Sequence, residues 1–217
     1  MKLALVNPNT SAEVTAAMLE IAREAAPAGY EIEGHTAPFG APLITEPAAL
    51  SRAALAVAAL APALGGADAA IVAAFGDPGL DALRARLDIP VTGIAEAGMA
   101  EAASGGRRFA VATTTPDLRD SIAATAARHG HRAFAGTWTT QGDPGALHAD
   151  ETALAAALLG AVAAAVDEGG AEAVVIGGGP LARAARTIAT RAPVPLIEPL
   201  PAAVRLTLAR LHEGVPR

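Results

Sequence analysis

The chain has 217 residues, 52% of them hydrophobic, so it is long enough to bury a sizeable core in one large domain or two small lobes. Its formal net charge of -6 and its scattered arginines argue against a nucleic-acid or anionic-membrane partner. The sequence has no cysteine, which excludes disulfides, thiolate metal sites and thiol nucleophiles, and its only lysine is Lys2, which argues against Schiff-base chemistry.

Short β-type runs alternate with Ala-rich helical stretches along the whole chain. In chain order, we expect strands at residues 3–6, 30–37, 69–75, 89–94, 108–114, 132–138, 171–178 and 194–198, and helices that begin near Ser11, Pro47, Asp117 and Asp150. This alternation predicts an α/β fold in which helices cover parallel sheets. No apolar run is long enough to cross a membrane, and the run after Met1 is too short for a secretory signal, so we expect a cytoplasmic protein.

The elements of the two halves recur in one order with nearly constant offsets. Three pairs of positions are 105, 104 and 103 residues apart: Asn9 with Thr114, Ala74 with Gly178, and Pro90 with Pro193. The spacing predicts a structural duplication, with two pseudosymmetric lobes and a ligand cleft between the carboxyl ends of their strands. We place lobe one at residues 1–100 plus 190–217 and lobe two at residues 101–189. The alternative is that this is the ordinary strand spacing of any α/β chain.

Four loops follow strands at the edge where open α/β sheets bind ligands. They are NPNTS (7–11), AFGDPG (74–79), TTTPD (113–117) and GGGPLA (177–182). Each combines small residues with a hydroxyl, an amide or uncrowded backbone N–H groups, which can solvate an anionic or enolate-like oxygen. Each alone also fits a helix cap or a tight turn, and the glycine run lacks both the P-loop lysine and the dinucleotide-binding spacing. Together the loops predict a site for a small acidic or cyclic-imide substrate.

Five motifs resemble the hydantoin racemase branch of the aspartate/glutamate racemase superfamily. They are NPNTS near the N-terminus, AAFGDPGLDALR (73–84), IPVTGIAEA (89–97), RFAVATTT (108–115) and VVIGGGPLA (174–182). The resemblance covers nearly the whole chain and implies two Rossmann-like lobes, no cofactor and an oligomer. It also implies a mechanism in which one cysteine of each lobe flanks the substrate carbon. One thiolate removes the α-proton, and the other thiol returns a proton to the opposite face.

This chain departs from the family pattern at both cysteine positions, which fall on Ala74 and Gly178. Neither side chain can exchange a proton, so the two-thiol mechanism is not available. Four carboxylates are the candidates for acid–base chemistry: Asp77, Glu46, Glu96 and Glu198. Glu96 and Glu198 each follow a late strand of their lobe and could approach the cleft symmetrically. Structural roles compete with this chemistry, because Asp77 could accept N–H bonds within its turn and the glutamates could interact with helix dipoles.

On the four loops, the substrate-binding candidates are Asn9, Thr10, Ala74, Phe75, Thr113, Thr114, Gly178 and Gly179. The five histidines lack a metal-binding spacing, so we expect no metal. The sequence favours a cofactor-independent, racemase-like enzyme that acts on a hydantoin-like cyclic ureide or a small α-substituted carboxylate, with a carboxylate or water in place of the thiols. The alternatives are a non-catalytic small-molecule binding protein on the same scaffold, and a hydrolase or lyase that acts on a related ring. We expect a small-molecule substrate and a homo-oligomer, with no nucleic-acid or membrane partner.

Overall fold

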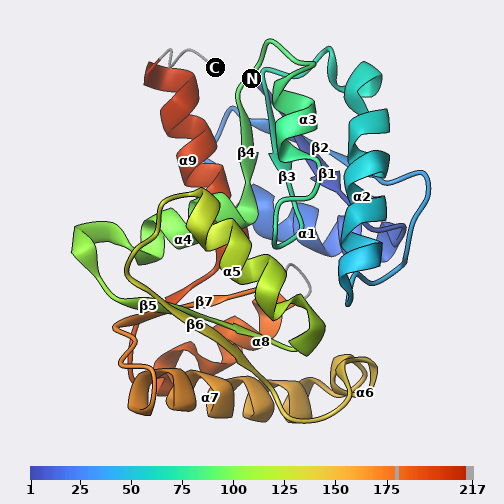
Figure 1. Cartoon of the computed structure of the whole chain (residues 1–217). Coiled ribbons are helices and arrows are strands. Elements are labelled where there is room, and N and C mark those ends of the chain that lie inside the picture. The colour runs from blue at the N-terminus through green and yellow to red at the C-terminus, as the bar shows by residue number, and fades with distance from the viewer. Residues whose placement is uncertain (179–180, 214–217) are drawn as a thin grey trace. The chain divides into compact units, whose positions relative to one another are not determined.

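The computed structural model describes residues 1–178 and 181–213, and the chain divides into two compact units. The first unit comprises Met1–Ala97 and Leu200–Arg217, and the second comprises Gly98–Pro199. Each unit contains one sheet with its own helices, so each is described by itself (Figure 1).

The expected lobe boundaries differ from these units at two places. Residues 98–100 and 190–199 were expected in lobe one, but they belong to the second unit. The later segment belongs there because its strand, Leu196–Ile197, pairs with the strand Ala173–Ile176 of the second sheet.

Strands and helices alternate in both units, and two helices carry the chain from one unit to the other. The first unit contains β1 (Lys2–Asn7), α1 (Ala12–Ala25), β2 (Glu31–Thr36), α2 (Pro47–Ala59), β3 (Ala69–Val72), α3 (Leu80–Arg84) and β4 (Val91–Gly93). The second contains β5 (Phe109–Thr113), α5 (Arg119–Arg128), β6 (Phe134–Thr139), α6 (Pro144–His148), α7 (Glu151–Asp167), β7 (Ala173–Ile176), α8 (Ala182–Ile188) and β8 (Leu196–Ile197). The connecting helices are α4 (Ile94–Ala102) and α9 (Pro199–Glu213).

The two sheets have the same strand order. Within the described residues, the first is a four-stranded parallel sheet in the order β2-β1-β3-β4, and the second is a four-stranded parallel sheet in the order β6-β5-β7-β8. The α/β fold class expected from the sequence is therefore confirmed, as is the recurrence of the elements in one order.

Three of the central strands, β3, β5 and β7, are buried on both faces. Every residue of β3, β5 and β7 is at most 1% exposed. In the second unit, Leu158 and Val162 of α7 and Ile188 of α8 pack on one face of the sheet, and α5 lies on the other side (Figure 1). Strands covered in this way are apolar along nearly their whole length rather than alternating, and Thr113 at the end of β5 is the one polar residue of these three strands. This is why the sequence shows them as continuous runs.

Five helices were not among the expected elements: α3, α4, α6, α8 and α9. Three of them span seven residues or fewer, which is too short for a helical period to stand out. Helix α4 starts directly after β4 without a loop, so its apolar residues continue the strand's run in the sequence. In the ranges that the structure describes, no helix combines the length and apolar character needed to cross a membrane.

Candidate functional site

A buried amide network holds the NPNTS loop at the carboxyl end of β1. Asn7 and Asn9 are 0% and 6% exposed. The Asn7 Nδ2 atom lies 2.8 Å from Asn9 Oδ1 and 2.9 Å from Thr15 Oγ1, and the Asn9 N–H donates to Asn7 Oδ1. The Ser11 N–H also donates to Asn9 Oδ1, and Ser11 Oγ caps α1 by accepting from the Val14 N–H. The network fixes the Asn9 carboxamide through its oxygen, and no described residue accepts a hydrogen bond from its Nδ2.

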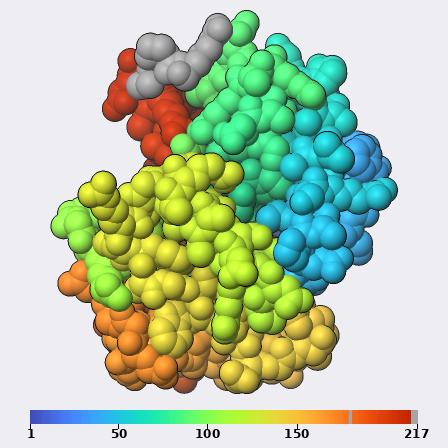
Figure 2. Space-filling model, in the orientation of Figure 1, coloured from blue at the N-terminus to red at the C-terminus, as the bar shows by residue number. Residues whose placement is uncertain are grey.

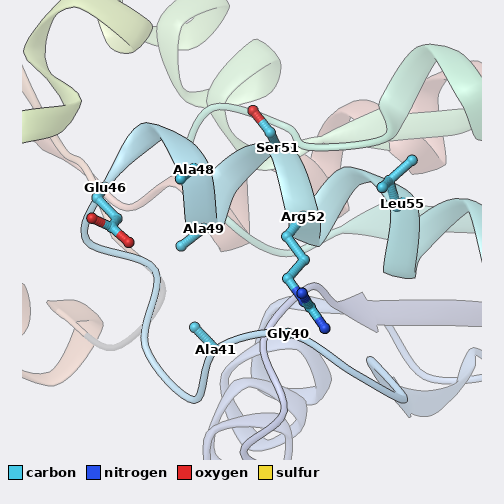
Figure 3. A pocket seen from close by; sticks show the side chains of 8 residues that line it. All are labelled: Gly40, Ala41, Glu46, Ala48, Ala49, Ser51, Arg52 and Leu55. Atoms are coloured by element: carbon cyan, nitrogen blue, oxygen red, sulfur yellow. The ribbon is translucent and has the colours of Figure 1, made fainter.

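A hollow of about 540 Å³ lies between α2 and the segment that follows β2, and we call it the α2 hollow. The NPNTS loop adjoins this segment, because the Thr10 N–H donates to the Ala41 carbonyl at 3.1 Å. The volume is within the range of small-molecule sites. The lining residues are Gly40, Ala41, Glu46, Ala48, Ala49, Ser51, Arg52 and Leu55 (Figure 3).

Glu46 lies at the N-terminal end of α2 in this hollow (Figure 3). Its side chain is exposed and makes no capping hydrogen bond to the helix. Among the described residues, none forms a hydrogen bond or ion pair with the Glu46 carboxylate. Glu46 therefore differs from the other three carboxylate candidates, all of which contact donors.

Asp77 caps the helix that follows the next strand of its sheet. The residue is 3% exposed, and its Oδ1 and Oδ2 accept from the N–H groups of Ala95 and Glu96 at 2.8 and 2.7 Å, in the first turn of α4. Its φ of 52° is uncommon for a residue other than glycine. The carboxylate fits only because Gly93 has no side chain, since a Cβ at that position would collide with Asp77 Cγ. This geometry favours a structural role for Asp77, with acceptor bonds to a distant helix rather than within its own turn.

Asparagine in place of Asp77 is expected to lower the free energy of unfolding by about 2 kcal/mol, because an amide NH2 group leaves one buried α4 N–H without an acceptor. Chemical denaturation measures the difference. Asp81→Asn is the matched control, since Asp81 is exposed in the first turn of α3 and its change is expected to stay within about 0.5 kcal/mol. Equal stabilities of the two variants would contradict the capping role.

Glu96 is held between two arginines. Its side chain is 12% exposed, and its Oε2 and Oε1 atoms lie 2.8 Å from Arg84 Nη2 and 2.7 Å from Arg210 Nη2, respectively. Burial raises the pKa of Glu96, but the hydrogen bonds and charges of Arg210 and Arg84 outweigh it and lower the pKa to about 2. A carboxylate with this pKa is a weak base at neutral pH, so the arrangement favours an ion pair that joins α3, α4 and α9.

Glu198 also pairs with an arginine, because its Oε2 atom lies 2.9 Å from Arg186 Nε.

Glu96 and Glu198 do not occupy equivalent positions of the two sheets. The third residues of β3 and β7 pair with the neighbouring strand as follows: Ile71 with Thr92, and Val175 with Ile197. This register aligns Glu198 with Gly93, three residues before Glu96, and the hypothesis that the two glutamates approach the cleft symmetrically stays a prediction.

Threonines gather at the carboxyl edge of the second sheet. Thr113 is 1% exposed, and its Oγ1 donates to the Gly177 carbonyl at 2.9 Å and lies 3.0 Å from Thr115 Oγ1. Thr115 precedes a short 3-10 helix but does not cap it with its side chain. Thr114 is 2% exposed, and the buried Thr140 Oγ1 has no partner in the part of the chain that the structure describes. The structure thus brings hydroxyl groups together beside the Gly177 carbonyl.

The Gly178 carbonyl accepts the same backbone hydrogen bond as the Ala74 carbonyl, from the N–H three residues later. The Leu181 N–H donates to the Gly178 carbonyl at 3.1 Å, as the Asp77 N–H donates to the Ala74 carbonyl at 3.1 Å. A Cβ on Gly178 would lie 3.1 Å from Leu181 Cγ and Cδ1, so a larger residue there requires this leucine side chain to shift by a few tenths of an ångström. The two positions are equivalent in their sheets, because each lies three residues after the third residue of its strand, β3 or β7, although the residues themselves differ.

The remaining expectations concern Phe75, Gly179 and metals. Phe75 is 8% exposed and therefore belongs to the interior of the first unit, and Gly179 lies outside the described residues. Among the residues that are described, no group of three or more His, Asp or Glu side chains could hold a metal ion. Sequence reasoning missed Arg52, because it lies in an Ala-rich helix whose pattern gives no sign of a hollow beside it.

Comparisons with known proteins agree on one family. The family model described as Asp/Glu/Hydantoin racemase matches residues 3–207. A hydantoin racemase of Paenarthrobacter aurescens is 30% identical over 213 residues, which cover 95% of this chain and 89% of that protein. An allantoin racemase from Klebsiella pneumoniae superposes with a TM-score of 0.92 at 30% identity, covering 100% of this chain and 89% of that one. The allantoin racemase from Pseudomonas fluorescens gives a TM-score of 0.94 at 29% identity, with coverages of 100% and 93%.

Proposed function

Because this chain belongs to the Asp/Glu/hydantoin racemase family, we propose that it acts on a hydantoin-like cyclic ureide or a small α-substituted carboxylate by racemase-type proton exchange, without a cofactor and without thiols. The family supports the racemase-like function, and the absence of cysteine requires another base.

The observation that carries the proposal is the prearranged Asn9 carboxamide. Its oxygen accepts hydrogen bonds from Asn7 and Ser11, which fixes the direction of the amide group and leaves the Nδ2 donors for another acceptor. Donors held in place before binding stabilise a developing oxyanion without reorganisation. Asn9 is proposed to bind the carbonyl oxygen next to the reacting carbon.

Glu46 is the proposed base. Asp77, Glu96 and Glu198 all contact N–H donors or arginines, whereas no described residue pairs with the Glu46 carboxylate. Glu46 also lines a hollow whose wall includes Ala41, the hydrogen-bond partner of the NPNTS loop.

The proposed step moves one proton and forms no covalent intermediate. The Glu46 carboxylate removes the α-proton, and the electron pair of the C–H bond moves into the adjacent carbonyl to form an enolate, whose oxygen accepts from Asn9 Nδ2. Water donates a proton to the carbon, and the hydroxide that remains takes the proton from Glu46, which restores both water and the carboxylate. Protonation at the opposite face inverts the carbon.

Proton NMR in deuterated water tests this proposal with 5-substituted hydantoins. We expect the α-proton signal to disappear without a new product and expect Glu46→Gln to slow this exchange by about 100-fold, because the amide cannot accept the proton. Glu13→Gln is the control, since Glu13 lies in the first turn of α1 and carries the same charge. Equal exchange rates in Glu46→Gln and the unmodified chain would exclude Glu46 as the base.

A non-catalytic small-molecule binding protein is the second candidate function. It is favoured by Ala74 and Gly178, which occupy equivalent positions after β3 and β7 and cannot exchange protons. Saturable hydantoin binding with no loss of the α-proton signal would support this candidate and contradict the enzyme. New product signals would instead indicate a hydrolase or a lyase.

The proposal includes two further expectations from the sequence, a homo-oligomer and a cytoplasmic location. Sedimentation equilibrium measures the first directly, because a single chain has a mass of 21.5 kDa.

A further inference from the structure

The far end of the α2 hollow holds an arginine without an acidic partner. Arg52 Cζ lies 5.8 Å from the centroid of the Phe39 ring, a cation–π contact that restrains the guanidinium group. In Figure 3 this group points away from α2 toward Gly40. Within the described residues, no carboxylate pairs with Arg52. Its positive charge is therefore available to a bound anion.

Arg52 and Glu46 lie at different places along the same helix. Glu46 is the N-cap residue of α2 and Arg52 lies six residues later, which corresponds to about 9 Å along the helix axis. The hollow between them is lined by Ala48 and Ala49, whose small side chains leave room for a ligand (Figure 3). A molecule whose reacting carbon lies at Glu46 can therefore extend a substituent toward Arg52.

We infer that Arg52 selects substrates whose α-substituent ends in a carboxylate. This inference rests on the proposed function, because it takes Glu46 to mark the reacting carbon. A guanidinium binds a carboxylate through two parallel hydrogen bonds with opposite charges, whereas a neutral amide offers one acceptor and no charge. The segment that contains α2, light blue in Figure 2, lies on the visible surface, so solvent moderates this preference.

The test compares two hydantoins of equal size, 5-(2-carboxyethyl)hydantoin and 5-(2-carbamoylethyl)hydantoin. We expect the carboxyethyl compound to exchange its α-proton about tenfold faster than the carbamoylethyl compound at subsaturating concentration. This ratio of the two exchange rates is expected to fall with added salt. Arg52→Gln is expected to bring the ratio close to one, and Arg52→Lys to keep an intermediate value, because a single ammonium lacks the bidentate geometry. Arg128→Gln, at an exposed position of α5, is the matched control and keeps the ratio.

The outcomes separate this inference from the proposed function. The unmodified chain could exchange the α-proton of 5-methylhydantoin and yet exchange the two test compounds at equal rates. That result would overturn the role of Arg52 and leave the proposed function standing. If no hydantoin exchanges, the proposed function fails, and an NMR titration with the two test compounds then decides the role of Arg52. Tighter binding of the carboxylate that is lost in Arg52→Gln supports that role, and equal binding of the two compounds overturns it.

Discussion

Glutamine in place of Glu96 is expected to lower the free energy of unfolding at neutral pH by about 3 kcal/mol, near the lower end for breaking a buried ion pair. The loss is large because Arg84 and Arg210 then face each other across an uncharged amide, with side chains only 35% and 24% exposed. The expected loss is near the lower end of the range for buried ion pairs because solvent still reaches both guanidinium groups. Chemical denaturation monitored by circular dichroism measures the difference.

Glu198→Gln is the matched control for this prediction. It removes the same charge from the pair with Arg186, whose side chains are 26% and 42% exposed, so we expect a loss below about 1 kcal/mol. Similar losses in both variants would contradict a special role for the Glu96 cluster.

The contribution of Glu96 also depends on pH in a defined direction. Its pKa in the folded chain, about 2, is below its ordinary value of 4.5, so its stabilising effect is complete above that ordinary value and is lost as the pH falls toward 2. The stability difference between the unmodified chain and Glu96→Gln should therefore shrink over this range. A difference that stays constant down to pH 2 would show that Glu96 does not stabilise the fold through its charge.

Cysteines at positions 74 and 178 together are expected to raise hydantoin racemisation by about 1,000-fold over the unmodified chain, because a thiolate and a thiol replace a weaker carboxylate base and water. The expectation uses the cysteine positions that the family resemblance implies. Position 74 already carries a Cβ, whereas a Cβ on Gly178 would lie 3.1 Å from the buried Leu181 side chain, so the second cysteine requires that side chain to shift by a few tenths of an ångström. Chiral chromatography of a single enantiomer measures racemisation.

The two variants with a single cysteine, at position 74 or at position 178, test proton removal separately from inversion. With one thiol, the proton is expected to leave and return on the same face, so deuterium enters without inversion. Serines at both positions are the control, because a hydroxyl has nearly the same size but does not ionise near neutral pH. A folded double-cysteine variant that is no faster than the double-serine variant would show that these positions do not flank the substrate carbon.

Much of the fold could be predicted from the sequence, because the signal for a buried strand lies in consecutive residues. The central strands of a covered parallel sheet are apolar in nearly every position, so β3, β5 and β7 stand out as runs, and the strands recur along the chain at nearly constant spacing. The last strand of the second sheet, β8, was harder to place in the correct unit. It has only two residues, and its place in the second sheet depends on its pairing with β7.

The roles of the candidate carboxylates were not readable in the same way. Asp77 and Glu96 stand at strand ends, as a catalytic carboxylate would, but their partners are distant in the chain. The Asp77 oxygens accept from N–H groups 18 and 19 residues later, and Glu96 binds an arginine 114 residues later. No local pattern contains such partners.

The sequence by itself determined the α/β class, the recurrence of the elements along the chain, the loops at the strand ends and the exclusion of thiol chemistry, because each depends on residue type or on spacing along the chain. Only the tertiary structure decided that Asp77 caps α4 and that Glu96 is paired with two arginines, while Glu46 lines a hollow with Arg52. The physical reason is that the chemistry of a carboxylate depends on the donors and charges within a few ångströms of it, and those are set by folding.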